Sequence, residues 1–280
     1  MTTMSGFPKG PKDPLVCIRG LSKQYVQRRP LTSAKFTIQA VENADLTIHR
    51  GATLAFVGES GAGKSTVARC LSLIEIPTSG EIWFDGVNVL ALPHKALSPL
   101  RRQIQIIFQD PTSALNPGMT AGEIIAEPLV IQHEGTKTQR RSRALELMEQ
   151  VGLPAKWESK LPLEFSGGQR QRLAIARALA LQPKLLILDE ALSGLDLANQ
   201  EMILRLLADL EAMHSLTYVH VSHDLRMVSG LADEVAVMYE GRVVEQKSTP
   251  ELFAHPEHPY TQDLLNAMPS LESICEERSA

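Results

Sequence analysis

The sequence predicts an α/β protein built around a parallel sheet. Short apolar runs alternate with helical patterns along the chain, and three of these runs end in residues suited to bind a ligand. Strands that alternate with helices form parallel sheets, whose ligands collect at the carboxyl ends of the strands. Gly58, Asp189 and His223 each follow such a strand. A functional site is therefore expected at this edge of the sheet.

The composition fits one large domain with or without appendages. The chain has 280 residues, is 44% hydrophobic and carries a net charge of -4. Nucleic-acid binders usually present a basic face, so we expect no nucleic-acid partner. Cys17, Cys70 and Cys275 share no C-x-x-C spacing, which favours free thiols in a reducing compartment over a zinc site or disulfides. No apolar run reaches the roughly 18–20 residues that cross a bilayer, so a membrane role would require a partner.

The N-terminal half is expected to begin with an antiparallel sheet. Residues 1–14 have no apolar segment of the kind found in signal peptides, and we expect them to form a disordered lead. Alternating apolar and polar residues predict strands or hairpins in three segments: Leu15–Val26, Phe36–Gly51 and Gly80–Val89. Between them, Ala52–Gly58 is expected as a buried strand, and a helix should run from about Lys64 to Ile74.

The C-terminal half is expected to supply helices and the remaining strands. Residues 111–165 follow a helical pattern. Apolar strand patterns occupy three segments: Pro183–Glu190, Thr217–Asp224 and the hairpin Val235–Gln246. The segment Asn199–His214 predicts an amphipathic helix. Its expected core face consists of Met202, Ile203, Leu206, Leu207, Leu210 and Met213. The segment Ser248–Ser270 predicts two short helices joined by a Pro-broken link, as an appendage outside the core.

One glycine-rich segment has the pattern of a phosphate-binding loop. Residues 58–65 read GESGAGKS, which satisfies G-x-x-x-x-G-K-[ST] between a predicted strand and a predicted helix. In such a loop the backbone N–H groups surround a phosphate, Lys64 reaches the β- and γ-phosphates, and Ser65 can ligate Mg²⁺. The alternative is a glycine-rich turn without a ligand. The predicted ATP-binding residues of this segment are Gly58, Glu59, Ser60, Gly61, Ala62, Gly63, Lys64, Ser65 and Thr66.

Two acids at the end of the strand Pro183–Glu190 predict metal binding and base catalysis. Asp189 is suited to hold Mg²⁺, directly or through water. Glu190 can orient and deprotonate an attacking water. A structural ion pair is the alternative, but it needs basic partners that the strand itself does not supply.

Three further residues are weaker candidates when each is taken alone. His223 stands at a strand end, where it could contact a γ-phosphate, although single histidines are more often structural. Gln109 follows a β-type run and could join a Mg²⁺ and water network. Tyr25 could stack on adenine or be part of the core.

A second anion-binding pattern occurs at Ser166, Gly167, Gly168 and Gln169, at the start of an alanine-rich helix. A hydroxyl and two glycines at a helix N-terminus can bind an anion, because unpaired N–H groups and the helix dipole both face outward there. Two such sites on one chain cannot easily hold the same small anion.

Four motifs together resemble those of the ATP-binding cassette (ABC) ATPase family. GESGAGKST resembles its Walker A motif, FSGGQ its signature, LLILDE its Walker B motif and SGLD, ending at Asp196, its D-loop. By this resemblance Gln109 corresponds to the Q-loop glutamine, His223 to the switch histidine and Tyr25 to the adenine-stacking aromatic residue. The resemblance spans roughly residues 15–250, with Phe165 and Gly194 as small departures.

The resemblance implies a fold and an assembly. The fold is that of a P-loop NTPase with a RecA-like parallel-sheet core, an antiparallel β subdomain and an α-helical subdomain at about residues 111–165. Family members work as head-to-tail dimers, in which the signature of one subunit closes on ATP held by Walker A of the other. A second ATPase subunit, identical or a paralogue, is therefore an expected partner, with ATP and Mg²⁺ as the expected ligands.

A narrower resemblance concerns FQDPTSALNP, EFSGGQRQR and the tail HPEHPYTQDLLNAMP, within residues 251–280. These segments are similar to the oligopeptide/dipeptide/nickel branch of importer ATPases. The implied function is to power solute uptake through transmembrane permease subunits at the cytoplasmic face of the membrane, served indirectly by an extracytoplasmic solute-binding protein. Cys275 stands alone, so we expect no iron–sulfur cluster. An exporter ATPase or a non-transport ABC protein remains the alternative.

Overall fold

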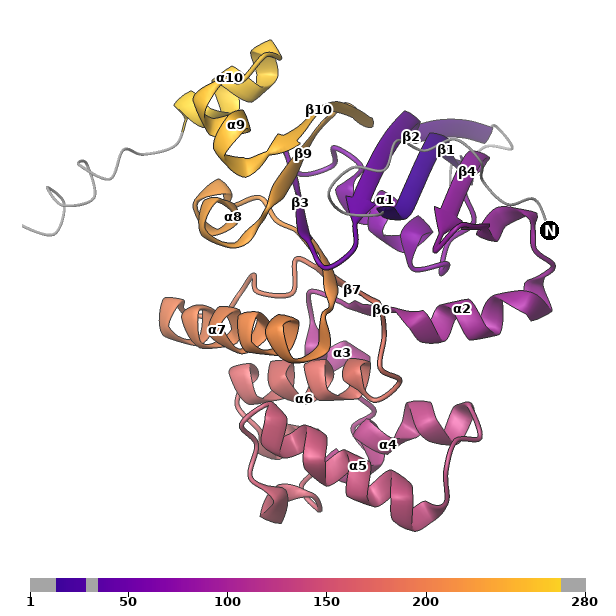
Figure 1. Ribbon diagram of the computed structural model, residues 1–280, viewed down its shortest axis with the longest axis vertical. Coiled ribbons are helices and arrows are strands. Elements are labelled where there is room, and N and C mark those ends of the chain that lie inside the picture. The colour runs from indigo at the N-terminus through magenta and orange to yellow at the C-terminus, as the bar shows by residue number, and fades with distance from the viewer. Residues whose placement is uncertain (1–13, 29–34, 268–280) are drawn as a thin grey trace, which may run out of the picture. The chain divides into compact units, whose positions relative to one another are not determined.

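The computed structural model describes residues 14–28 and 35–267. The expected N-terminal lead lies outside these residues except for Pro14, which begins the first strand. The chain divides into two compact units (Figure 1). The first contains the described residues up to 70, residues 75–91 and the described residues from 221 onward, and the second contains residues 71–74 and 92–220.

The first unit contains a four-stranded antiparallel sheet in the order β2-β1-β4-β5. Its strands are β1 (Pro14–Arg28), β2 (Lys35–His49), β4 (Ser79–Phe84) and β5 (Val87–Asn88). Cys17 in β1 pairs with Thr47 on one side and with Trp83 on the other. The antiparallel strands expected from the alternating pattern are thus confirmed.

Three further strands of the first unit carry the parallel pairing. In the order β10-β9-β3, β3 (Thr53–Val57) runs parallel to β9 (Glu234–Tyr239), and β9 is antiparallel to β10 (Arg242–Ser248). All five residues of β3 are buried, as a continuous apolar run in a parallel sheet requires. The helices of this unit are α1 (Lys64–Leu71), α8 (Leu225–Leu231), α9 (Thr249–Ala254) and α10 (Pro259–Asn266), with a short 3₁₀ turn at Val89–Ala91. Helix α1 ends earlier than the expected Ile74.

The second unit contains three strands in the order β8-β7-β6. They are β6 (Ile104–Ile107), β7 (Leu185–Asp189) and β8 (Thr217–Val221), and β6 pairs in parallel with β7. Every residue of β7 and of β8 is buried. These are the two apolar runs from which the sequence predicts buried parallel strands.

Helices make up most of the second unit. They are α2 (Ser98–Gln103), α3 (Pro111–Ala114), α4 (Ala121–Ile131), α5 (Lys137–Gln150), α6 (Gly167–Leu179) and α7 (Leu197–His214), with 3₁₀ turns at His94–Leu97, Ala155–Trp157 and Pro162–Glu164. Capping boxes begin α4, α5 and α6. In these boxes a side chain at the helix start and one at the third helical position exchange hydrogen bonds with the backbone, which fixes where each helix begins.

The core face predicted for α7 is wrong in part. Ile203, Leu207 and Leu210 are buried, whereas Met202 is 49% exposed and Met213 is 56% exposed. The buried stripe is therefore narrower than the six apolar residues suggest. Periodicity places residues on one helical face, but the neighbouring elements decide how much of that face is covered.

The expectation that the C-terminal tail is an appendage outside the core is also wrong. Leu252 of α9 has 0% exposure and belongs to a buried cluster that includes Val57 of β3. Tyr260, Leu264 and Leu265 pack against the same cluster. Figure 1 shows α9 and α10, in yellow, beside the end of β10. The tail up to residue 267 thus contributes to the core of the first unit.

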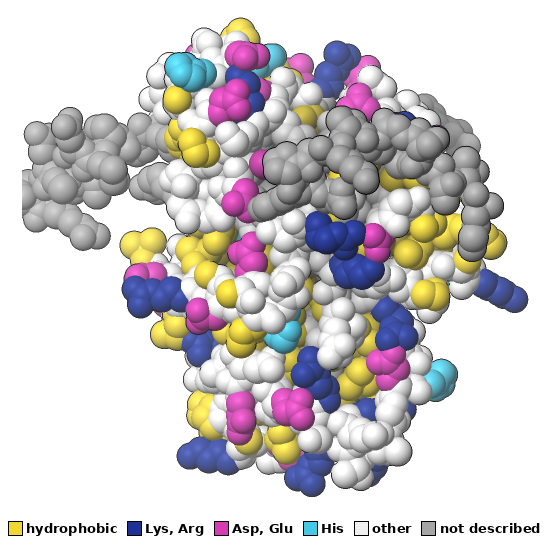
Figure 2. Space-filling view, in the orientation of Figure 1, with side chains coloured by type: hydrophobic (Ala, Val, Ile, Leu, Met, Phe, Trp, Pro, Cys, Tyr) yellow, Lys and Arg dark blue, Asp and Glu magenta, His cyan; other side chains and the backbone are white. Residues whose placement is uncertain are grey.

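None of the described helices combines the length and the apolar character that a membrane-crossing segment requires. Figure 2 shows acidic and basic side chains intermixed over the described residues of the face in view.

Candidate functional site

The glycine-rich loop between β3 and α1 has a backbone that only glycine can form at two positions. Gly58 has φ 141°, and a Cβ there would lie 2.1 Å from the carbonyl oxygen of Met238. Gly63 has φ 100°, and its Cβ would lie 2.4 Å from the carbonyl oxygen of Ala40. The loop therefore packs backbone against backbone on its inner side. Glu59, Ser60 and Gly61 are exposed on the outer side.

The side chain of Lys64 lies inside this loop and bonds to its backbone. It is the first residue of α1 and is only 4% exposed. Its Nζ donates hydrogen bonds to the carbonyl oxygen of Gly58 at 2.8 Å and to that of Glu59 at 2.7 Å. These two bonds place the amino group of Lys64, a hydrogen-bond donor, inside the loop. Together with the N-terminus of α1 this favours an anion, and the residues present fit a bound polyphosphate.

Tyr25 lies in β1 of the same unit, and its side chain is half-buried. Its hydroxyl donates a hydrogen bond to the carboxylate of Glu75, and the Nζ of Lys23 lies 5.1 Å from its ring centroid. Burial and the Glu75 carboxylate raise the pKa of Tyr25, so the ring remains neutral. The Tyr25 side chain thus has two charged neighbours in the first unit, Glu75 at its hydroxyl and Lys23 over its ring.

His223 lies in the loop between β8 and α8, and it is exposed. The preceding residue fixes this loop: Ser222 donates its backbone N–H to the carbonyl oxygen of Phe56 at 3.0 Å, and its hydroxyl accepts the N–H of Asp224 at 3.0 Å. Phe56 belongs to β3, which leads into the glycine-rich loop. The structure therefore places His223 in the same unit as that loop, on a segment tied to the same strand.

His220, which lies within β8, has a structural environment. His220 is 4% exposed, and burial lowers its pKa to about 4. It is therefore neutral at physiological pH. The contrast with the exposed His223 separates the two histidines of VHVSHD, which the sequence alone does not do.

Asp189, the last residue of β7, and Glu190, which follows it, differ in environment. Asp189 is 5% exposed, while Glu190 is half-buried and has φ 51°, in the left-handed region. The carbonyl oxygen of Glu190 accepts hydrogen bonds from the N–H of Ser193 at 3.0 Å and from its hydroxyl at 2.8 Å. A non-glycine residue in this conformation costs roughly 1–2 kcal/mol. Backbone strain of this kind is often retained at functional sites because it orients a side chain.

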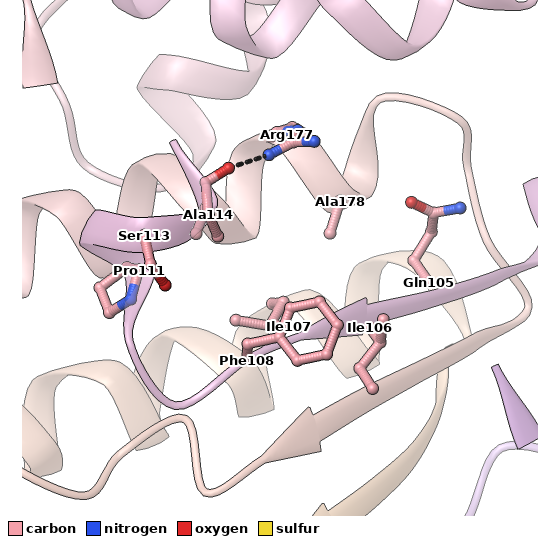
Figure 3. Close-up of a pocket in the computed structure, with 10 residues that line it drawn as sticks. Gln105, Ile106, Ile107, Phe108, Pro111, Ser113, Ala114, Arg177 and Ala178 are labelled. Carbon is pink, nitrogen blue, oxygen red and sulfur yellow. Dashed lines mark hydrogen bonds between the residues drawn. The ribbon is translucent and has the colours of Figure 1, made fainter. Parts of the chain in front are cut away.

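Gln109 is exposed in the loop that follows β6. The loop begins beside a cavity of about 290 Å³ within the second unit. Figure 3 shows Ile107 and Phe108 on one side of this cavity and Ala114 and Arg177 on the other. The Nη1 of Arg177 donates a hydrogen bond to the carbonyl oxygen of Ala114 at 2.6 Å, which ties α6 to α3.

The signature segment forms the start of α6. Ser166 is the N-cap: its hydroxyl accepts the N–H of Gln169 at 3.4 Å, and its own N–H donates to Oε1 of Gln169 at 3.0 Å. Ser166 and Gly167 are exposed, whereas Gly168 is buried. A Cβ on Gly168 would lie 2.6 Å from Oδ1 of Asn199, so a larger residue at this position requires the Asn199 side chain to move. Ser166 therefore uses its hydroxyl to cap the helix.

Asp196 caps the neighbouring helix α7 and is exposed. Its carboxylate accepts the backbone N–H of Asn199 at 2.9 Å and the side-chain Nδ2 of Asn199 at 2.6 Å. These bonds lower the pKa of Asp196 and keep it ionised. Asn199 thus joins the N-terminus of α7 to Gly168 of α6 within the second unit.

The predicted residues divide between the two units. The first unit contains Tyr25, the loop Gly58–Thr66 and His223; the second contains Gln109, the segment Ser166–Gln169, Asp189, Glu190 and Asp196. Among the described residues no group of three or more His, Cys, Asp or Glu side chains could hold a metal on its own. A cation bound by the described residues would therefore draw on further ligands, such as hydroxyls, amides and phosphate oxygens.

One contact was not predicted from the sequence. The hydroxyl of Tyr260 in α10 accepts the backbone N–H of Glu59 at 2.9 Å. The HPYT segment of the tail resembles a branch of importer ATPases, but that resemblance does not indicate what its tyrosine contacts.

Comparisons with known proteins identify the family. Residues 41–193, more than half of the chain, match the family described as ABC transporter. The chain is 44% identical over 258 residues to the dipeptide transport ATP-binding protein DppF of Haemophilus influenzae, covering 92% of this chain and 79% of that protein. It is also 44% identical over 257 residues to a putative peptide import ATP-binding protein of Brucella ovis, covering 92% and 79%.

Solved structures are similar over most of the chain. The ATP-binding cassette MJ0796, in a dimeric post-hydrolysis state bound to ADP and Pi, has a TM-score of 0.73 at 30% identity and covers 84% of this chain and 98% of its own. The cbiO1 protein from Clostridium perfringens, part of the transporter complex cbiONQ, has a TM-score of 0.76 at 28% identity and covers 95% and 100%. The expected fold is confirmed by these structures. The chain therefore belongs to the ABC transporter family and is one of its ATPases.

Proposed function

We propose that this chain is the ATP-hydrolysing subunit of an importer that powers uptake of peptides or a related small solute. The observation that carries the ATP-binding part is the glycine-rich loop closed around the Lys64 ammonium. The 44% identity to dipeptide transport ATP-binding proteins over more than nine-tenths of this chain supports the importer part.

In this proposal the loop Gly58–Thr66 binds the phosphates of ATP through its backbone N–H groups. Lys64 exchanges its loop carbonyl partners for phosphate oxygens, so its charge is available where negative charge develops during transfer. Tyr25 stacks on the adenine and His223 contacts the γ-phosphate.

Ser65, Gln109 and Asp189 are the residues proposed to hold Mg²⁺. Their hydroxyl, amide and carboxylate oxygens are the hard donors that this ion prefers, together with phosphate oxygens. When bound, Mg²⁺ would neutralise charge on the β- and γ-phosphates.

Glu190 is the proposed general base. It accepts a proton from water as the water oxygen attacks the γ-phosphorus, while the bond from that phosphorus to the bridging oxygen of ADP breaks. Its left-handed backbone, held by Ser193, fixes the direction in which the side chain leaves β7.

The exposed start of α6 is proposed to act on a neighbouring subunit. Ser166, Gly167, Gly168 and Gln169 would close on ATP held by the loop of a second ATPase, with Asp196 at the same contact. The dimeric state of a similar cassette supports this assembly. The partner is a second copy or a paralogue, and the pair would act on permease subunits at the cytoplasmic face of the membrane, supplied by an extracytoplasmic solute-binding protein.

Uptake by cells tests the proposal. A strain deleted for this chain is complemented with the wild type or with Glu190→Gln, and uptake of labelled dipeptides, longer peptides and nickel is measured. We expect wild-type cells to take up at least one of these solutes, and we expect the deletion and the variant to lose it. Unchanged uptake of all three in the deletion strain would rule out the importer role. Permease subunits that co-purify in mild detergent would identify the membrane partners.

A further inference from the structure

The tail contacts the first peptide group of the glycine-rich loop. In the peptide group between Gly58 and Glu59, the N–H of Glu59 donates a hydrogen bond to the hydroxyl of Tyr260 at 2.9 Å. The two residues are 201 positions apart in the chain. The carbonyl oxygen of the same peptide group accepts Nζ of Lys64 at 2.8 Å. The first peptide group of the loop is therefore held on both sides, by the lysine on one and by α10 on the other. A cation on the carbonyl polarises the peptide and strengthens the N–H as a donor.

The ring of Tyr260 is itself fixed. It lies against the ring of Tyr239, with a centroid distance of 4.3 Å and an interplanar angle of 31°. Tyr239 ends β9, and two residues later Gly241 donates its N–H to the carbonyl oxygen of Ala62 in the same loop at 3.1 Å. The hairpin β9–β10 and the tail thus contact the loop at two separate points and stack on each other through the two tyrosines.

The tail is anchored by buried polar contacts as well. Glu245 of β10, only 8% exposed, accepts the N–H groups of Glu257 at 3.0 Å and His258 at 3.1 Å. Nδ1 of His258 accepts the N–H of Tyr260 at 3.2 Å and caps α10. Lys247 lies 3.1 Å from Glu245 and 2.8 Å from Glu257. Figure 2 shows acidic, basic and histidine side chains together over this part of the molecule.

Apolar packing completes the connection. Tyr260, Leu264 and Leu265 cover the buried cluster that contains Val57, the last residue of β3 before the loop. The hydrogen bond to the loop and the apolar packing on this cluster come from the same helix. A tail that only covered the surface would need neither a hydroxyl aimed at the loop nor a capped helix to present it.

We propose that α10 braces the glycine-rich loop and that Tyr260 is a positioning residue for nucleotide binding. The inference rests on the proposed role of Gly58–Thr66 in holding phosphates. A loop that is already in its binding conformation loses less freedom when a ligand arrives, and the apparent affinity falls with the fraction of loops in that conformation. Removing the Tyr260 hydroxyl should lower that fraction while every residue of Gly58–Thr66 stays unchanged.

The test uses the full chain and compares Tyr260→Phe with Tyr239→Phe. The first change removes the hydroxyl on the loop and keeps the ring stack, and the second removes a neighbouring hydroxyl from the other ring of the stack. We expect Tyr260→Phe to weaken ATP binding by about 2- to 10-fold, as the loss of one hydrogen bond implies. We expect the KM for ATP to rise by the same factor, with kcat at saturating ATP within about twofold of the wild type. Tyr239→Phe should bind ATP as the wild type does, and both variants should melt at the wild-type temperature without nucleotide.

Lys64→Ala separates this inference from the assignment of the loop. If Lys64→Ala weakens ATP binding while Tyr260→Phe does not, the brace is overturned and the loop assignment stands. If Lys64→Ala leaves ATP affinity unchanged, the loop assignment itself fails. Equal losses in Tyr260→Phe and Tyr239→Phe, with a lower melting temperature in both, would reduce Tyr260 to a packing residue.

Discussion

The carboxylate of Glu245 accepts the backbone N–H of His258 at 3.1 Å and so ties β10 to the start of α10. Burial alone would raise the pKa of Glu245, but the N–H groups of Glu257 and His258, with Lys247 nearby, outweigh it and hold the value at about 2. A charged carboxylate is therefore built into the junction between the core and the tail.

Glu245→Gln should lower the free energy of unfolding by about 1–3 kcal/mol at pH 7, since it removes a charge that buried N–H groups and Lys247 satisfy. The pKa is lower in the folded protein than its ordinary value of 4.5. The stabilisation is thus complete above about pH 4.5 and is lost as the pH falls toward 2.

Urea unfolding of the wild type and the variant at several pH values between 7 and 3 measures this effect. The difference between the two proteins should shrink as the pH falls. The exposed Glu149, changed to Gln, is the control and should show little difference at any pH. A wild-type to variant difference as large at pH 3 as at pH 7 would contradict the assignment of charge stabilisation to Glu245.

Glu190→Gln should leave ATP binding intact and lower turnover on the order of 10²-fold or more, because the attacking water loses its base. Gel filtration with ATP should show accumulated dimers. Glu190→Gly should be as inactive as Glu190→Gln. Its free energy of unfolding should be about 1 kcal/mol higher than that of Glu190→Gln, since glycine adopts the left-handed backbone without strain. Near-normal hydrolysis in Glu190→Gln would eliminate Glu190 as the base. A Glu190→Gly protein with a melting temperature no higher than that of Glu190→Gln would show that the backbone at this position stores no strain.

The two glycines of the signature should respond differently to alanine. At Gly168 a Cβ would lie 2.6 Å from Oδ1 of Asn199, whose side chain is held by Asp196. At Gly167 the nearest atom would be 4.0 Å away, in Leu195. Gly168→Ala should therefore lower the melting temperature. Gly167→Ala should keep or raise it, because alanine stabilises a helix by about 1 kcal/mol relative to glycine. Thermal melts of the pair decide this, and equal melting temperatures would show that Asn199 moves aside.

Ser166→Arg tests whether the signature acts on a neighbouring subunit. The loop proposed to hold ATP is unchanged in this variant, so the ATP affinity of the monomer should hardly change. Closure of the dimer should fail, because a long side chain occupies the space in front of the helix start. A 1:1 mixture with Lys64→Ala should regain part of the ATPase activity, since one composite site of the mixed dimer is intact.

Ser166→Ala is the matched control for this experiment. It removes the N-cap, at a cost of about 1 kcal/mol, but adds no bulk. Its dimer should therefore close, at a somewhat lower melting temperature. Subunit exchange is checked by labelling each variant. A Ser166→Arg monomer that no longer binds ATP would mean that the signature acts within its own chain.

The tail also changes an expectation about truncation. Because the motifs of the catalytic site precede Pro250, removal of residues 251–280 would be expected from the sequence to leave nucleotide binding intact. The structure favours the opposite outcome, since Leu252 is fully buried and Tyr260 contacts Glu59. Calorimetry with ATP on the truncated chain distinguishes the two, provided that circular dichroism shows the chain is folded.

The sequence by itself determined the features that depend on local chemistry. A buried strand, a glycine-rich turn and a helix beginning at Lys64 follow from neighbouring residues. The same is true of the helix start near Ser166 and of the strand that leads to Asp189 and Glu190. Such patterns are readable because backbone conformation, capping and strand burial are set within a few residues.

Only the tertiary structure decided the features that depend on residues far apart in the chain. It placed Met238 against Gly58, Asn199 against Gly168 and Tyr260 against Glu59, and it left Met202 of α7 exposed. No local pattern predicts these contacts, because each depends on how separate elements pack, and packing is fixed by the shapes of both surfaces at once. The motifs could therefore be predicted from the sequence, while the contacts that hold them in position depend on the tertiary structure.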